Sequence, residues 1–205
     1  MPMIRETIVT TMNPEGTVHI APLGIIADGD GWIIAPFRPS TTLENLRELP
    51  YAVANHTDDV RIFAGCLTGR RDWPVTPSDC VPVPRLATAL AHAELAVTEV
   101  ADDAQRPRFR CRVVHQAAHA PFQGFNRAQA AVIEAAILVS RLAFLPREKI
   151  ERELAYLEIA VGKTAGTAER EAWDWLMGAV GRPGAPPLDP ARGQATPGPG
   201  SLEGS

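Results

Sequence analysis

A basic residue followed by a run of hydroxyl side chains at a helix start is the part of this sequence best suited to bind an anion. In the segment "PFRPSTTLENLRELP", Arg38 stands two residues before the Ser-Thr-Thr cluster of residues 40–42. A helix N-terminus offers backbone N–H groups and the positive end of the helix dipole, and an arginine can add two parallel hydrogen bonds to a phosphate. Asn45, one turn further on, could turn toward the same site. These residue types fit a phosphate site.

The same segment also suits ordinary helix capping. Thr41 and Glu44 have the spacing of a capping box, with Thr41 as the N-cap. Leu43 and Leu46 supply an apolar face, and Pro50 ends the helix. In this interpretation Arg38 is a solvated side chain, and no glycine-rich loop supports a phosphate. The residues alone leave both interpretations open.

Three charged residues recur at a spacing of seven in the apolar stretch "GFNRAQAAVIEAAILVSRLAFL". They are Arg127, Glu134 and Arg141. This spacing puts them on one face of a helix, either as a structural ion-pair ladder or as the wall of a substrate pocket in which an arginine meets an acidic substrate. Buried charges need partners, so both interpretations predict that Glu134 is paired.

The histidines do not show the spacing of metal ligands. His115 and His119 are four residues apart, but that spacing brings two ligands to one face only in a helix, and this stretch is predicted to be a strand and its end. We therefore predict no metal site. The sequence also lacks a G-x-S-x-G motif, and its cysteines and histidines do not favour a cysteine nucleophile.

The elements that must position these residues begin with a β-meander. Strands are predicted at 4–12, 17–27 and 32–37, joined by the turns "NPEG" and "DGDG". Pro22 and Gly24 predict a break in the pairing of the second strand. The meander predicts antiparallel pairing.

Further strands are predicted after the segment with Arg38. A strand at 51–56 and a short helix or turn at 58–69 precede an irregular stretch, and strands follow at 92–100 and 108–114. Both late strands alternate polar and apolar residues, so each should have one buried and one wet face. The polar residues of the last strand are Arg108, Arg110 and Arg112. This row is either a solvated face or a face turned to a partner or ligand.

Three helices are predicted in the C-terminal part. The first begins at Asn126, with Gln129 completing a capping-box pattern. The second covers 147–161 and ends at Gly162, and the third covers about 168–180.

Composition narrows the class of protein. The chain has 205 residues and a net charge of -4, which suits one soluble domain with an appendage and does not suit a nucleic-acid binder. Its three cysteines lack motif spacing, and the N-terminus lacks the apolar core of a signal peptide, so reduced thiols and a cytoplasmic location are expected. The most apolar stretch contains Glu134 and Arg141, which argues against a membrane span.

Several segments carry a resemblance to a known family. The β-meander followed by the Arg38 segment resembles the start of the FMN-binding split-barrel fold. The segments "ETIVTTMNPEGTVHIAPLGI", "PFRPSTTLENL", "AVANHTDDVRIFA" and "GFNRAQAAVIEAAILVSRL" are similar to the domain-of-unknown-function family DUF447, over about residues 4–180.

The resemblance implies an α+β fold, an antiparallel split β-barrel with a C-terminal helical subdomain. We expect a flavin-binding barrel at 1–123, a helical extension packed on it at 124–180 and a disordered Pro/Gly-rich tail at 181–205. The implied ligand is FMN, held at the subunit interface of a homodimer. The implied activity is a flavin-dependent oxidation or reduction of a small molecule, with a suggested link to pterin-dependent one-carbon metabolism. A non-catalytic FMN-binding or carrier module is the alternative.

The resemblance also assigns site residues. The phosphate contacts would be Arg38, Ser40, Thr41 and Thr42, supported by Asn45. The flavin ring would lie against the second and third strands, near His19, Ala21, Pro22, Leu23 and Gly24. Asn55 either faces the same cleft or is an ordinary strand-end residue.

Overall fold

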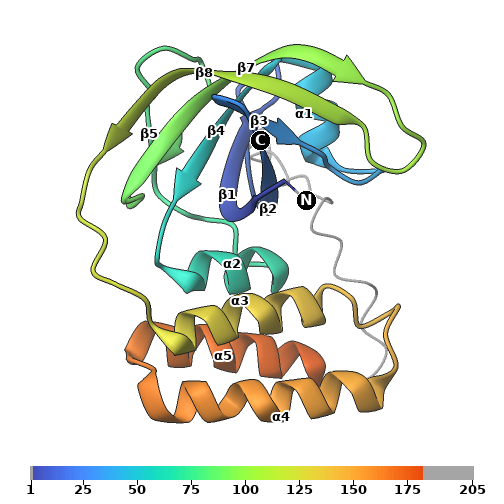
Figure 1. The fold of residues 1–205 in the computed structure, drawn as a ribbon, viewed down its shortest axis with the longest axis vertical. Helices are drawn as coiled ribbons and strands as arrows, with labels where there is room; N and C mark the ends of the chain where they lie inside the picture. Colours follow the sequence, from blue (N-terminus) through green and yellow to red (C-terminus); the bar gives the residue numbers. More distant parts are fainter. Residues whose placement is uncertain (1, 182–205) are drawn as a thin grey trace, which may run out of the picture.

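Six strands of the protein close into an antiparallel barrel in the order β1-β2-β3-β8-β7-β4 (Figure 1). The computed structural model describes residues 2–181, so nearly all of the tail predicted at 181–205 lies outside the described residues. The barrel strands are β1 (Ile4–Met12), β2 (Val18–Asp28), β3 (Gly31–Ile34), β4 (Tyr51–His56), β7 (Ala91–Ala101) and β8 (Arg108–Ala118). With the helices described below, the predicted α+β class and antiparallel barrel are confirmed.

The first hairpin is regular over its whole length. β2 pairs with β1 in one continuous register that includes Pro22 opposite Ile8, so the predicted break in pairing is wrong. On its other side β2 pairs with β3 only at Ile26–Asp28. A proline is compatible with an intact ladder when its nitrogen faces an unpaired edge, and the first part of β2 has such an edge on the β3 side.

Apolar side chains fill the barrel interior. Alternate residues of neighbouring strands meet there, including Val9, Ile25, Leu95 and Phe109, and all of these are nearly inaccessible to solvent. This inward face follows from the period of two along each strand.

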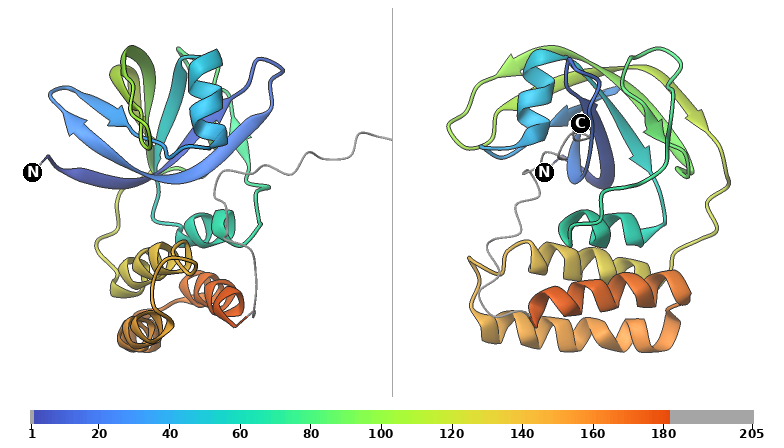
Figure 2. Two further views of the ribbon diagram at one scale, coloured as in Figure 1. Left: turned by 90° about the vertical axis from the view of Figure 1, so that its right-hand side faces the viewer. Right: turned by 180° about the vertical axis from the view of Figure 1, so that it is seen from behind.

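Helix α1 (Thr41–Glu48) lies against one side of the barrel (Figure 2). Its Leu43 and Leu46 belong to the barrel core. The N-cap is Ser40, whose hydroxyl oxygen accepts a hydrogen bond from the backbone N–H of Leu43 at 3.3 Å. The predicted cap at Thr41 is therefore wrong by one residue, because the extended backbone that a cap requires lies at Ser40.

The two late strands differ in how much of their polar face is wet. Arg108, Arg110 and Arg112 of β8 are exposed, as the solvated-face interpretation predicts. On β7, however, His92 and Glu94 are buried, at 1% and 0% exposure, so the prediction of a wet face is wrong for this half of the strand.

The cover over this part of β7 comes from the connection that was predicted to be irregular. It contains the short hairpin of β5 (Val75–Thr76) and β6 (Arg85–Leu86). Between these two strands, Val81 and Val83 pack against Val53 of β4.

The remaining helices form a layer below the barrel (Figures 1 and 2). They are α2 (Val60–Leu67), α3 (Arg127–Val139), α4 (Arg147–Thr164) and α5 (Thr167–Val180). α2 joins the two layers, because Ile62 and Phe63 pack with Ile8 and Ile20 of the barrel while Val60 packs in the helical core. No helix among residues 2–181 is long and apolar enough to cross a membrane.

The predicted helix boundaries hold in part. Asn126 is the N-cap of α3, accepting from the Ala128 N–H at 2.7 Å, but Gln129 donates to Glu169 of α5 instead of closing a capping box. Gly162 lies inside α4, which continues to Thr164, so the predicted end of this helix is wrong.

Candidate functional site

The N-terminus of α1 meets the turn between β7 and β8, and this junction brings basic side chains together. The Arg38 backbone N–H donates to the Gln105 carbonyl at 2.9 Å, which holds the chain before α1 against the turn. Asp103 shapes the turn by accepting from the backbone N–H groups of Gln105 and Arg106 at 2.8 and 2.7 Å. These two hydrogen bonds lower the pKa of the Asp103 carboxyl.

Three guanidinium groups lie at this junction, and the one of Arg47 pairs with Asp102 at 3.5 Å. Arg38 donates to the Asp103 carbonyl at 3.0 Å and forms an ion pair with Asp102. Arg106 donates twice to the Ala35 carbonyl, at 3.1 and 2.9 Å, and stacks 4.3 Å over the Phe37 ring. The turn thus holds the Arg38 side chain, whereas the Arg106 side chain reaches from the turn to the chain before α1.

The hydroxyl cluster lies beside these arginines, at the start of the helix. Ser40 and Thr41 are half-buried, whereas Thr42 is almost fully buried at 3% exposure. The first backbone N–H groups of a helix lack intrahelical acceptors, and the helix dipole is positive at this end. The junction can therefore hold a phosphate-like anion, in competition with the carboxylate of Asp102 for Arg38.

Neither predicted asparagine faces an open cleft. Asn45 is buried and donates its side-chain amide to the Thr11 hydroxyl at 3.0 Å, so it braces α1 against β1. Asn55 is fully buried, donates to the Ile8 carbonyl at 3.0 Å and accepts from the Leu86 N–H at 2.7 Å. Its side chain thereby joins β1, β4 and β6 in the interior of the protein.

The residues predicted to contact a flavin ring lie on both faces of β2. Leu23 packs with the barrel core, and the period of two places Ala21 and His19 on the same inner face, where both are buried. Pro22 and Gly24 lie on the outer face. A Cβ at Gly24 would come within 2.9 Å of Ile4 and 3.2 Å of the Glu6 carboxylate. The side chains of these five residues therefore do not share one face of the strand.

The three charged residues of the apolar stretch do not form the predicted ladder. Arg127 is the first residue of α3, and Arg141 lies beyond its end. Both are exposed, as is Glu134, and within residues 2–181 no ion pair involves Glu134. The predicted pairing of Glu134 is wrong, because the helix buries its alanine and valine face and turns Glu134 to the surface.

Glu134 instead lines a surface hollow of about 310 Å³ between α3 and α4. The hollow is lined by Glu134, Leu138, Arg152, Glu153, Tyr156 and Leu157. Arg127 and Arg141 are not among these residues. The two arginines therefore do not share this hollow with Glu134.

The buried thiols are poor nucleophiles. Burial raises the pKa of Cys66 to about 11 and that of Cys111 to about 12, so both remain protonated at neutral pH. The Cys66 thiol also donates to the Ile20 carbonyl at 3.6 Å, and the Cys111 thiol to that of Phe109 at 3.4 Å. Their roles are structural.

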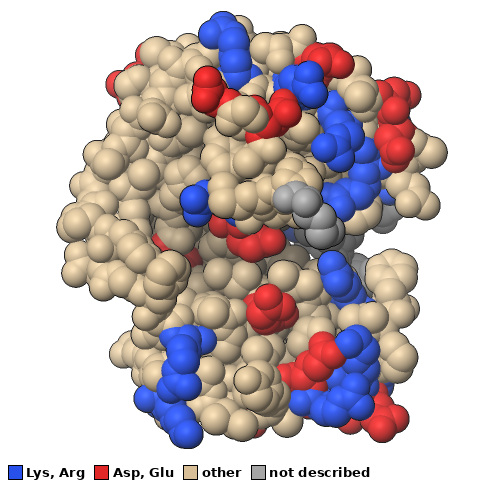
Figure 3. Space-filling view, viewed as in Figure 1, with Lys and Arg blue, Asp and Glu red and all other residues tan. Residues whose placement is uncertain are grey.

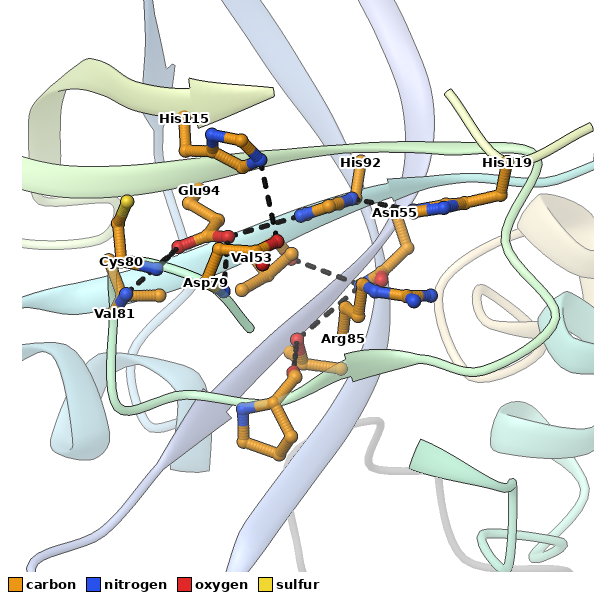
Figure 4. Close-up of polar contacts among 12 residues, drawn as sticks. Val53, Asn55, Asp79, Cys80, Val81, Arg85, His92, Glu94, His115 and His119 are labelled. Carbon is orange, nitrogen blue, oxygen red and sulfur yellow. Dashed lines mark hydrogen bonds and ion pairs between the residues drawn. The ribbon is translucent and has the colours of Figure 1, made fainter. Parts of the chain in front are cut away.

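A second polar cluster lies on β7 and β8, under the connection between β5 and β6 (Figure 4). The Glu94 carboxylate accepts three backbone N–H bonds, from Asp79, Cys80 and Val81, at 2.7–2.8 Å. Desolvation alone would raise the pKa of Glu94, but these bonds and that from His92 outweigh it and lower the pKa. The buried carboxylate is therefore ionised.

Three histidines belong to this cluster. His92 contacts Glu94 through Nε2 at 3.2 Å and His119 through Nδ1 at 2.9 Å, and His115 lies 3.4 Å from the Asp79 carboxylate. Desolvation lowers the pKa of His119 and the positive charge of Arg85 lowers it further, while the nearby Asp79 carboxylate acts in the opposite direction.

Residues that reasoning from the sequence missed fall into two groups. Arg106 follows a turn, and only the pairing of β7 with β8 brings it beside Arg38. Glu94, His92 and Asp79 meet because His92 and Glu94 alternate along one strand, with a loop folded over them. The i, i+2 spacing of His92 and Glu94 on a predicted strand was the available signal.

Comparisons with known proteins agree with this fold. The family model for the N-terminal domain of the protein of unknown function DUF447 matches residues 5–120, and the model for the protein of unknown function DUF447 matches residues 126–178. No curated protein matches the chain.

Two solved structures resemble the chain in fold. An FMN-bound DUF447 protein from Methanosarcina mazei is 20% identical, with a TM-score of 0.75 over 87% of this chain and 96% of that one. A putative flavin reductase with a split barrel domain from Shewanella frigidimarina is 12% identical, with a TM-score of 0.51 over 60% of this chain and 74% of that one. The barrel is thus a split barrel, and the two family models together show that this chain belongs to the DUF447 family.

Proposed function

We propose that this chain is an FMN-binding flavoprotein and that the α1 junction holds the FMN phosphate. Arg38 would contribute a charged hydrogen bond, and Ser40, Thr41 and Thr42 lie at the helix start that would receive the anion. Arg106 adds a second positive charge. Flavin supplies hydride or electron transfer, and the residues named here bind and orient its phosphate.

One observation carries this proposal. The α1 N-terminus, Arg38 and Arg106 converge next to β3 of the barrel. The similar structure from Methanosarcina mazei is FMN-bound. Asp102 does not rule out phosphate at this place, because an arginine has five N–H donors and Arg38 uses only part of them here.

The packing of β2 limits where the flavin ring could lie. Because the inner face of β2 is packed, a ring would use the outer face or the unpaired edge of this strand rather than the barrel interior. We include in the proposal a homodimer with the ring at the subunit interface. The exposed Phe37 ring, which lies beside the phosphate junction, would be available to such a contact.

The proposed activity is a flavin-dependent oxidation or reduction of a small molecule. The alternative is a non-catalytic module that holds or delivers FMN, and one observation favours it: Arg127 and Arg141 do not converge on a pocket with Glu134. The link to pterin-dependent one-carbon metabolism rests on the family resemblance and stays a prediction.

The experiment that separates enzyme from carrier is anaerobic reduction of the FMN-loaded protein by NADH and by NADPH. A flavoenzyme of this kind should bleach the visible flavin band faster than the same concentration of free FMN is bleached. Reduction no faster than that of free FMN with either donor, together with tight FMN binding, would favour the carrier. A protein that fails to bind FMN would contradict both versions.

A further inference from the structure

Four side chains that could ligate a metal ion gather on the outer face of β7 and β8. They are Asp79, His92, Glu94 and His115, and their ligand atoms all lie within 4.8 Å of one another. His92 and Glu94 are two residues apart on β7, and His115 lies directly opposite Glu94 on β8. The period of two and this register put the three side chains on one face, and the β5–β6 connection brings Asp79 over them (Figure 4).

The spacing of the ligand atoms fits direct coordination. Atoms bound tetrahedrally at about 2.0–2.1 Å from one ion lie about 3.3 Å apart along each edge. His92 Nε2 and Glu94 Oε1 are 3.2 Å apart, and His115 Nε2 and Asp79 Oδ2 are 3.4 Å apart. Each pair therefore already has the separation of one tetrahedral edge.

Neighbouring groups hold the two buried ligands in place. His119 Nε2 lies 2.9 Å from His92 Nδ1. When His92 carries its proton on Nδ1 and donates it to His119, the Nε2 lone pair of His92 is directed at the cluster. Three backbone N–H groups fix the Glu94 carboxylate. An ion would take the place of the proton between His92 and Glu94, as metals do when they bind ligands that are otherwise protonated.

We propose that these four residues bind one divalent first-row transition metal ion, such as Zn²⁺. Two imidazole nitrogens with two carboxylates suit such an ion, whereas Ca²⁺ and Mg²⁺ prefer oxygen ligands alone. Asp79 and His115 keep 66% and 34% of their side-chain surface exposed, which provides a path of entry. The bound ion would fasten the β5–β6 connection to the barrel.

The metal site is separate from the proposed phosphate site. His92 lies near the start of β7, whereas Asp102, which pairs with Arg38, directly follows its end. A strand advances about 3.3 Å per residue, so these ten residues separate the two sites by roughly 30 Å along the strand. The inference does not depend on FMN binding.

The test is a titration of the full-length chain, freed of metal with a chelator, with Zn²⁺ followed by calorimetry and with Co²⁺ followed by its visible spectrum. We expect one ion per chain. Asp79→Asn and His115→Ala should each weaken Zn²⁺ binding by at least about tenfold, since each removes a ligand. His119→Ala should weaken it by about ten- to a hundredfold, because His119 positions His92.

Two variants serve as controls. Asp72→Asn makes the same chemical change as Asp79→Asn at an exposed residue before β5, and it should leave binding unchanged. Cys80→Ser removes an exposed thiol next to Asp79. The Cys80 sulfur is turned away from the Glu94 carboxylate (Figure 4), so this variant should also bind Zn²⁺ normally. Circular dichroism of each metal-free variant checks that it is folded.

Two results would overturn the inference. One is the absence of Zn²⁺ and Co²⁺ binding by the folded wild-type protein. The other is binding that survives in both Asp79→Asn and His115→Ala but is lost in Cys80→Ser, which would assign the ion to the thiol.

Discussion

Single buried residues stabilise this protein through hydrogen bonds between segments that are distant in the sequence. Asn55 shows this most clearly, because its side-chain amide links the Ile8 carbonyl on β1 with the Leu86 N–H on β6 while the residue itself lies on β4. A residue with both ends of its amide occupied and no exposed surface stabilises the fold.

Asn55→Ala should therefore lower the free energy of unfolding, by about 1–3 kcal/mol for each buried group left without a partner. Urea denaturation measures this loss. Asn13→Ala is the matched control, since Asn13 accepts one hydrogen bond, from the Thr17 N–H, at an exposed turn. FMN affinity of the folded Asn55→Ala protein should equal that of wild type. Normal stability combined with lost FMN binding would show that Asn55 is a flavin ligand after all.

At the scale of elements, α1 combines a structural cap with the proposed anion site in one residue. Ser40 accepts from the Leu43 N–H and so stabilises the helix whose N-terminus would receive the phosphate. The two roles can be separated, because aspartate caps helices about as well as serine but carries a negative charge.

Ser40→Asp should therefore leave the free energy of unfolding within about 0.5 kcal/mol of wild type while weakening FMN binding, since a carboxylate would repel the phosphate. Ser40→Ala removes the cap without adding a charge. It should lower the free energy of unfolding by about 1 kcal/mol. Urea denaturation and FMN titration of both variants measure these effects. Undiminished FMN affinity in Ser40→Asp would place the phosphate elsewhere.

Much of the element pattern could be predicted from the sequence, because its signals are local. The two early turns, the strand at β4 and the cap at Asn126 each depend on a few neighbouring residues. The predictions for β2 and β7 were wrong because they depend on contacts between residues that are distant in the sequence. Pro22 keeps its pairing because of where β3 lies, and the burial of His92 and Glu94 depends on a connection that folds back over β7.

The candidate site could likewise be predicted only where its chemistry depends on neighbouring residues. The segment from Arg38 to Thr42 carries its own chemistry, so its position at a helix start could be predicted, although the cap lies at Ser40 and not at Thr41. The position of Arg106 beside Arg38 and the meeting of Asp79 and His115 with Glu94 could not be predicted, since they depend on strand register and on a folded-back loop; only the spacing of His92 and Glu94 was visible in the sequence. The five β2 residues assigned to the flavin ring stay a prediction, and since a strand turns alternate side chains to opposite faces, their side chains do not share one face.

The whole molecule has a barrel layer above a helical layer, and its surface is hollowed between them, where acidic side chains lie (Figure 3). Glu6 of β1 and Glu134 of α3 belong to different layers but interact electrostatically. The pKa of Glu6 is raised, first by desolvation and then by the negative charge of Glu134. A raised carboxyl pKa favours the folded state at low pH, and this contribution is lost as pH rises through the folded pKa.

Glu134→Gln should therefore lower the pKa of Glu6 toward its ordinary value, and it should make the folded protein more stable at neutral pH than wild type. NMR titration of the Glu6 side-chain carboxyl measures the pKa, and urea denaturation at neutral pH measures the stability. Glu158→Gln, at an exposed position of α4, removes the same charge elsewhere and should change neither. An unaltered Glu6 pKa in Glu134→Gln would mean that the two layers sit further apart in solution.

The central claim is that the α1 junction binds the FMN phosphate, and the most direct test is FMN titration of wild type, Arg38→Ala and Arg108→Ala, followed by flavin fluorescence. Arg108 is an exposed arginine of β8 and controls for the loss of one positive charge. We predict that wild type and Arg108→Ala bind FMN alike and that Arg38→Ala binds about ten- to a hundredfold more weakly, since one charge-assisted hydrogen bond is lost. Equal affinity in all three proteins, or no binding by wild type, would contradict the account.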